Sequence, residues 1–213
     1  MTDTVRYPLV LGLIAASSAA ALAVSYSLTR DEIQRRQALA KARGLAAVFG
    51  VELKDDGSPP PWSELPGDAY TIYAGTDPKT GRALYAAEGS ARGYSSRIEV
   101  VVAIDQSLKD NPDAARLKAV KVVYQNDTPG LGDKCQAPEF QEQFQDLLLR
   151  RLALRKGASY RVPGAQGADD QEIAAITGAT VTSNAVLSAV RQAIERIRAR
   201  VAQQTGSPAP ERP

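Results

Sequence analysis

The stretch "ITGATVTSNAV", Ile176 to Val186, gathers hydroxyl side chains around a glycine between two apolar segments. Before it, "EIAAI" (residues 172–176) is a candidate for a short strand. After it, residues 183–203 carry apolar side chains in steps of four, four, three and four, the spacing of one helix face: Val186, Val190, Ile194, Ile197 and Val201. A strand, a small polar turn and an amphipathic helix therefore follow one another here.

The hydroxyls of this turn have two interpretations. A helix N-terminus has unpaired N–H groups and a partial positive charge, so it is a natural seat for a phosphate. Gly178 and Ala179 would let a ligand approach the backbone closely. Alternatively, Thr180, Thr182 or Ser183 simply caps the helix. The turn is not a P-loop, because no lysine follows it and its glycine spacing is wrong.

A second candidate loop is "NDTPGLGDK", Asn126 to Lys134. Pro129 and Gly130 suit a type II turn, and Gly132 adds a second conformationally permissive position. The two glycines on either side of Leu131 make a thin loop that could lie against a flat ring. The same residues could equally form a tight connection between a strand and the next helix.

The middle of the chain predicts an antiparallel sheet. Four short runs rich in tyrosine, alanine or valine read as strands, the first two of them as a hairpin: residues 69–74, 82–89, 97–105 and 117–126. Residues 106–114 form a turn-rich connection, and residues 55–68 form a loop with Trp62 as a packing residue. Residues 138–155 predict one helix, with proline in its first turn and an apolar face.

No charged residue occurs in the N-terminal segment from Tyr7 to Thr29. Its 23 residues are long enough to span a hydrocarbon core of about 30 Å. We expect an uncleaved membrane anchor, with a signal peptide cleaved after Ala21-Leu22-Ala23 as the competing interpretation and a buried soluble helix as a third. The basic residues that follow favour a cytoplasmic main body, yet large domains cross membranes largely regardless of such charge.

The composition excludes several kinds of chemistry. The chain has no histidine, which excludes Ser-His-Asp and Cys-His catalysis and histidine-based metal sites. Cys135 is the single cysteine, so an intrachain disulfide and a thiolate metal cluster are excluded as well. The net charge of +2, without a basic cluster, gives no reason to expect a nucleic acid partner. Redox chemistry would therefore need an organic cofactor.

Three motifs in order, behind one N-terminal span, resemble a known family: "GYSSRIEVVVAID", "DTPGLGDK" and "ITGATVTS". They are similar to the G subunit of Rnf/Rsx electron-transport complexes and to the related C subunit of the sodium-pumping NADH:quinone reductase. The resemblance implies an α+β fold, with a single transmembrane helix and an FMN-binding domain of antiparallel sheet and packed helices. The expected parts are an anchor (1–29), a helical stalk (30–54), the FMN-binding domain (55–203) and a disordered tail (204–213).

The resemblance also implies a covalent cofactor. Such subunits carry FMN on a threonine through a phosphoester that a separate flavin transferase makes from FAD, and the matching residue is Thr180. The residues expected around the cofactor are Thr177, Gly178, Ala179, Thr182, Ser183, Asp127, Thr128, Gly130, Leu131, Gly132 and Tyr94. The implied function is an electron relay without a catalytic site of its own, beside other subunits of an ion-translocating complex. The soluble domain would face the periplasm at the bacterial inner membrane.

The chain departs from the family pattern in two places. The aspartate that leads the transferase pattern would fall at Ala174, which supports the alternative of a flavin-free structural subunit. Asp127 stands where the family usually has glutamate; it could bond the flavin edge, or cap the Thr128–Pro129 turn, which we favour. Tyr94 could lie beside the flavin or pack on the sheet, and packing is the favoured expectation.

Overall fold

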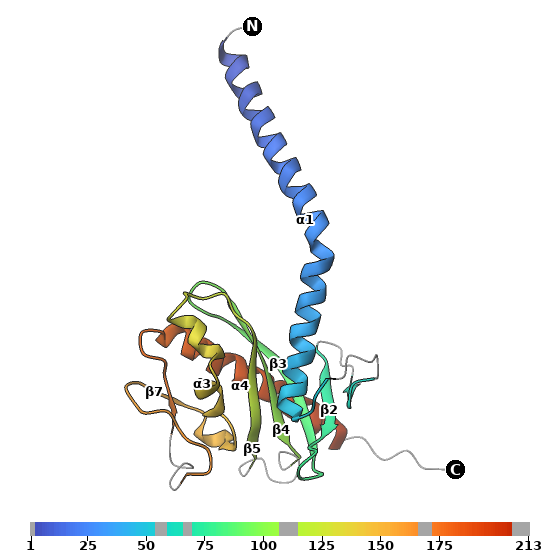
Figure 1. Cartoon of the computed structure of the whole chain (residues 1–213), viewed down its shortest axis with the longest axis vertical. Coiled ribbons are helices and arrows are strands. Elements are labelled where there is room, and N and C mark those ends of the chain that lie inside the picture. The colour runs from blue at the N-terminus through green and yellow to red at the C-terminus, as the bar shows by residue number, and fades with distance from the viewer. Residues whose placement is uncertain (1–2, 54–58, 66–69, 107–114, 166–171, 206–213) are drawn as a thin grey trace, which may run out of the picture. The chain divides into compact units, whose positions relative to one another are not determined.

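The computed structural model describes residues 3–53, 59–65, 70–106, 115–165 and 172–205. It divides into two compact units, residues 1–40 and residues 41–213. Helix α1 (Asp3–Phe49) contributes to both units, and its first part is long and apolar enough to cross a membrane, with a mean hydropathy of 1.9. The helix fits the single-pass anchor that the sequence predicts. The segment predicted as a stalk continues the same helix as far as Phe49 (Figure 1).

The second unit is built on an antiparallel sheet of six strands in the order β1-β2-β3-β4-β5-β6. The strands are β1 (Trp62–Leu65), β2 (Ile72–Thr76), β3 (Ala83–Arg92), β4 (Arg97–Asp105), β5 (Arg116–Tyr124) and β6 (Leu147–Leu148). The predicted α+β class and hairpin are confirmed, and β2 to β5 lie side by side in Figure 1. The sheet is wider than the four predicted strands, because β1 and β6 add one short strand at each edge.

Helix α4 (Thr180–Thr205) covers one face of this sheet. Its predicted apolar stripe is buried with the inward side chains of β4 and β5, which explains why the helix forms on this face. Gly89 on β3 lets the two elements approach closely, because a Cβ there would overlap the Ala189 carbonyl. The helix begins at Thr180, within the hydroxyl-rich run, rather than at Ser183.

The opposite face is covered by the last turns of α1. Leu45, Val48 and Phe49 are buried there with residues of β2, β3 and β4. Trp62 stacks on Phe49 with 5.7 Å between ring centroids, which confirms its predicted packing role, although it lies in β1 rather than in a loop. The end of the predicted stalk is therefore part of the core of the second unit.

The single helix predicted for residues 138–155 is wrong. The structure has a short helix α3 (Pro138–Glu142), strand β6, a 3-10 turn η2 (Leu149–Arg151) and strand β7 (Leu154–Arg155). Leu147–Leu148 pair with β5, and Asp146 adopts a φ of 54°, which interrupts a helix. The buried Arg161 guanidinium donates hydrogen bonds to the carbonyl oxygens of Gln143 and Gln145, at 2.9 and 2.7 Å. These oxygens therefore accept from a side chain and not from the N–H groups of a next helical turn.

The predicted strand at 172–176 is confirmed, although it is short. Strand β8 (Ile173–Ala174) pairs in parallel with β7, in a separate two-stranded sheet. The predicted turn-rich connection at 106–114 and the predicted disordered tail at 204–213 lie almost wholly outside the described residues.

Candidate functional site

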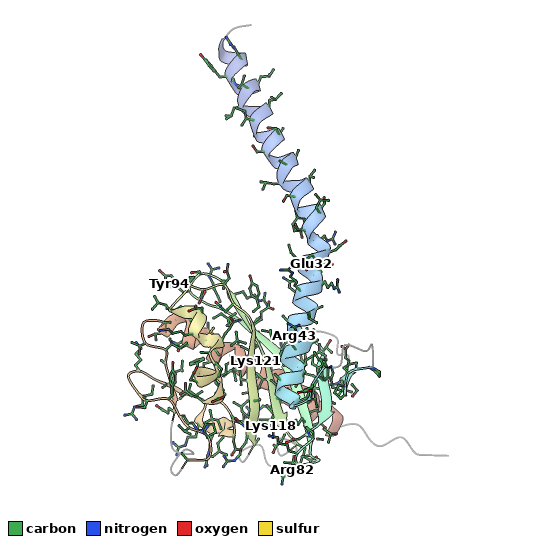
Figure 2. The ribbon with its side chains drawn as sticks, in the orientation of Figure 1. Glu32, Arg43, Arg82, Tyr94, Lys118 and Lys121 are labelled. Carbon is green, nitrogen blue, oxygen red and sulfur yellow. The ribbon has the colours of Figure 1, made fainter. Side chains whose placement is uncertain are left out.

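Three connecting loops meet at one end of the large sheet. They are the β3–β4 turn (residues 93–96), the loop that follows β5 (residues 125–131) and the loop that precedes α4 (residues 175–179). The antiparallel pairing of β3, β4 and β5 brings the β3–β4 turn and the loop after β5 to the same end of the sheet. Figure 2 shows Tyr94 at this end, with Arg82 and Lys118 toward the other. The motifs that the sequence singled out are thus neighbours in space.

Asp127 joins these loops. Its buried carboxylate accepts hydrogen bonds from the N–H groups of the β3–β4 turn, at 3.2 Å from Tyr94, 2.9 Å from Ser95 and 3.0 Å from Ser96. The Ser96 hydroxyl adds a fourth bond at 3.3 Å. The fifth donor is the Thr182 hydroxyl on α4, at only 2.6 Å. One side chain therefore holds a turn of the sheet against the start of a helix.

The charge of Asp127 is stabilised by hydrogen bonds rather than by a cation. Burial by itself raises the pKa of Asp127, but the bonds from Thr182, Ser95, Ser96 and Tyr94 outweigh burial and lower it. No lysine or arginine pairs with this carboxylate among the residues that the structure describes. Asp127 is therefore an anion at neutral pH, buried among neutral donors.

Two glycines make room for this arrangement. A Cβ on Gly132 would lie 2.6 Å from the Asp127 Cβ and 3.0 Å from the Thr182 hydroxyl oxygen. A Cβ on Gly93 would lie 2.8 Å from an Asp127 carboxylate oxygen. Both separations are too short for real side chains, so glycine is needed at both positions by close approach.

The hydroxyls at the start of α4 have different environments. Thr182 donates to Asp127, and Ser183 accepts from the Ile176 N–H and donates to the Ala179 carbonyl, both at 3.0 Å. These two hydroxyls therefore do not cap the first-turn N–H groups, and the capping interpretation is wrong for them. Thr180, the first residue of α4, is half-buried, and its hydroxyl makes no hydrogen bond to any described residue.

The loop after β5 has the predicted type II turn. The Leu131 N–H donates to the Thr128 carbonyl at 3.2 Å, and Gly130 has the required positive φ of 76°. Thr128, Pro129 and Gly130 are exposed. Leu131 lies against Gly178, whose φ is 81°, because a Cβ on Gly178 would come within 3.1 Å of the Leu131 side chain. The second candidate loop thus touches the first.

Two expectations about this region are wrong. Tyr94 does not pack on the sheet: its side chain is 71% exposed, although its N–H is bound to Asp127. Asp127 does not cap the Thr128–Pro129 turn, because its carboxylate caps the β3–β4 turn instead. Burial explains the second correction, since a carboxylate withdrawn from water needs several N–H or O–H donors and the β3–β4 turn supplies them.

The remaining predicted site residues surround Thr180. Thr177 and Gly178 are exposed, while Ala179 is buried. Ala174 is fully buried in β8, and its N–H and carbonyl bond the Gln143 side-chain amide at 2.8 and 3.3 Å.

Cys135 lies close to this region but is inert. Burial raises the pKa of its thiol to about 11, with Asp127 and Asp133 adding to the effect. The thiol is therefore protonated at neutral pH and makes a poor nucleophile.

Ser95 and Ser96 were not predicted as site residues. They lie in the "GYSSRIEVVVAID" motif, and serines beside a glycine are typical of turns. Nothing in the sequence, however, pairs them with Asp127. The buried pair formed by Gln143 and Arg161 was also missed, because both residues were assigned to other structure or left unassigned.

The three loops form a surface that could bind a ligand. No group of three or more histidine, cysteine, aspartate or glutamate residues that could hold a metal occurs in the described segments. Exposed apolar side chains occur on these loops, namely Leu131 and Tyr94, and Val181 is exposed next to Thr180 in the sequence. Such a surface can receive a flat ring beside the N–H groups of a helix start.

Comparisons with known proteins agree with this geometry. Residues 93–195 match the model of the FMN-binding domain family, a segment that contains all three loops. The G subunit of the ion-translocating oxidoreductase complex of Methanosarcina acetivorans is 28% identical over 88% of this chain and 90% of the relative. The G subunit of the proton-translocating ferredoxin:NAD(+) oxidoreductase complex of Clostridium ljungdahlii is 32% identical over 53% of this chain and 52% of the relative.

A solved structure supports the fold. The C subunit of the Na(+)-translocating NADH-quinone reductase from Parabacteroides distasonis aligns with a TM-score of 0.54 and 15% identity, over 83% of this chain and 97% of that one. The resemblance drawn from the three sequence motifs is confirmed by these matches. Residues 93–195 thus match the FMN-binding domain family, and the relatives to which the chain is similar are G subunits of ion-translocating oxidoreductase complexes.

Proposed function

We propose that this protein is a membrane-anchored FMN subunit that relays electrons inside an ion-translocating oxidoreductase complex. The family match, the G-subunit relatives and the apolar α1 helix support this assignment. Its partners are the other subunits of the complex, and the lipid bilayer surrounds residues 7–29. The anchor ends near residue 29, residues 30–54 connect it to the FMN-binding domain of residues 55–203, and the domain lies on the periplasmic side of the bacterial inner membrane.

The observation that carries the covalent attachment is the state of the Thr180 hydroxyl. Of the three hydroxyls in the first turn of α4, Thr182 and Ser183 are engaged in buried hydrogen bonds. Thr180 is half-buried and free of hydrogen bonds to the described residues, and it stands at the helix start. A phosphoryl group on this oxygen would meet the unpaired N–H groups of the first turn, which favour negative charge.

The residues around Thr180 fit an attached FMN. Gly178, with its positive φ, allows a close approach of the ligand to the backbone, and Leu131 and Tyr94 offer exposed apolar surface to the ring. When bound, FMN supplies reversible one- and two-electron transfer, and the protein contributes binding, orientation and electrostatic tuning. The buried anion of Asp127 is fixed nearby through Thr182.

Attachment requires a separate flavin transferase. The Thr180 oxygen would form the new bond to the FMN phosphorus of FAD while the bond between the two phosphates breaks. The hydroxyl loses its proton, and AMP leaves. No described residue accepts a hydrogen bond from the Thr180 hydroxyl, so the base for this step would come from the external enzyme.

The test is in-gel flavin fluorescence of the denatured full-length chain after coexpression with a flavin transferase. We expect a bright band for the wild type, a dark band for Thr180→Ala and an unchanged band for Thr76→Ala. Thr76 is the matched control, because it is an exposed threonine of β2 that lies outside the three loops. Intact mass of the chain identifies the adduct as FMN. A band of equal brightness in Thr180→Ala would contradict attachment at this residue.

A flavin-free structural subunit is the second candidate, and Ala174 favours it. Ala174 stands where the transferase pattern has an aspartate, and it is fully buried in β8. This alternative predicts a dark wild-type band with normal assembly into the complex. A third result, flavin that washes out on denaturation, would indicate reversible FMN binding.

A further inference from the structure

The loop after β5 and the first turn of α4 are joined by one polar contact. The Thr182 hydroxyl donates to Asp127 at 2.6 Å. No other hydrogen bond between described residues links residues 93–96 or 125–134 to residues 177–184. The Leu131–Gly178 contact is the apolar complement of this bond. The relative position of the two motifs therefore depends on Asp127.

This contact allows little freedom. Asp127 is buried, five donors fix both of its oxygens, and Gly132 and Gly93 approach it too closely for any side chain. A hydrogen bond to a charged group is stronger than one between neutral groups. The carboxylate therefore fixes the side of α4 on which Thr182 lies.

The same bond sets the direction of Thr180. Two residues along an α-helix correspond to a rotation of about 200°, so Thr180 and Thr182 lie on nearly opposite sides of α4. Holding Thr182 inward, at the carboxylate, directs Thr180 outward, which agrees with its half-buried state. The same rotation of α4 therefore buries the Thr182 hydroxyl and leaves the Thr180 hydroxyl accessible.

We propose that Asp127 is a positioning residue for the group attached at Thr180: acting through the Thr182 hydroxyl, it fixes the rotation of the first turn of α4 against the Thr128–Gly132 loop. This inference rests on the proposed function. Asp127 does not touch the flavin in this account, because its carboxylate is enclosed by protein donors.

The experiment uses the full-length chain coexpressed with a flavin transferase and purified in detergent. Thr182→Val removes the hydroxyl and keeps the shape of the side chain. We expect it to slow flavin attachment about tenfold, which corresponds to about 1.4 kcal/mol. We also expect the fluorescence anisotropy of the attached flavin to fall. Thr182→Ser keeps the hydroxyl and should restore both quantities.

The matched control is Asp77→Asn, a second buried aspartate that holds a turn at the other end of the sheet. It should lower thermal stability without changing attachment rate or anisotropy. If Thr182→Val behaves like Asp77→Asn, or if Thr182→Ser fails to restore both readouts, the positioning role is overturned while attachment at Thr180 stands. If the wild-type chain carries no flavin at all, the proposed function is overturned, and the positioning role with it.

Discussion

Asp127 and Asp77 are buried aspartates that hold turns at opposite ends of β3, but among the residues that the structure describes only Asp77 has a cationic partner. Asp77 accepts bonds from the Lys79 N–H at 2.9 Å, the Thr80 hydroxyl at 3.0 Å and the Lys118 ammonium at 2.6 Å. The ten residues of β3 separate the two turns by about 30 Å. Each of the two turns is thus held by a buried carboxylate. Lys118 neutralises the charge of Asp77, whereas neutral donors surround Asp127.

The two aspartates differ in whether their negative charge is neutralised by a cation. At Asp77 the ion pair ties the β2–β3 turn to β5 and cancels the charge, as expected of a structural contact. At Asp127 neutral donors stabilise an anion beside the loops that we assign to the flavin. A buried, unpaired charge is costly, so its presence there favours a functional interpretation over a purely structural one.

The largest expected effect comes from Asp127→Asn. The amide group turns one acceptor into a donor, which faces the N–H groups of residues 94–96 or the Thr182 hydroxyl. We expect a loss of about 3 kcal/mol in the free energy of unfolding, since a buried network is broken. Urea denaturation followed by circular dichroism measures it. A loss no greater than that of Asp77→Asn would remove the proposed distinction between the two sites.

The next prediction compares two glycines: Gly132, where a side chain would clash with its neighbours, and Gly81, where it would strain the backbone. Gly132→Ala would place a methyl group 2.6 Å from the Asp127 Cβ, so we expect a loss of about 2 kcal/mol from overpacking. Gly81→Ala, in the Asp77 turn, has a φ of 67° but open space around the new methyl, and should cost only about 1 kcal/mol. Thermal denaturation of both variants checks the order, and equal losses would show that the Asp127 site is less tightly packed than the structure indicates.

The contribution of Asp77 to stability should be lost at acid pH. Its hydrogen bond with Lys118 is the leading cause that lowers its pKa to about 2, despite burial. A depressed carboxyl pKa stabilises the fold above the unfolded value near 4, and the contribution disappears as the pH falls from about 4 to about 2. Lys118→Met should weaken this acid dependence and cost about 1–2 kcal/mol at pH 7. Unfolding midpoints at pH 7 and pH 3 measure both, and an unchanged acid dependence would contradict the pairing.

The two aspartates also mark what could be predicted from the sequence. The strands, the last helix and the type II turn at Pro129–Gly130 follow from local periodicity and turn chemistry, and the structure has them. The Asp127–Thr182 bond joins residues 55 positions apart, and no local pattern contains that contact. The predicted helix at 138–155 failed for the same reason, because Arg161 and β5 take the partners that a helix would have used.

The smallest expected effect on stability is that of Thr180→Ala, and it is informative because it is small. The Thr180 hydroxyl makes no hydrogen bond to the described residues, so its removal should change the free energy of unfolding by less than about 0.5 kcal/mol. Thr182→Val, two residues away, loses the bond to Asp127 and should cost about 2 kcal/mol. Denaturation of the unmodified chains compares them directly. A hydroxyl that contributes little to folding, beside one that contributes much, is free to accept a phosphoryl group, whereas a large loss in Thr180→Ala would mean that this oxygen is already committed to the fold.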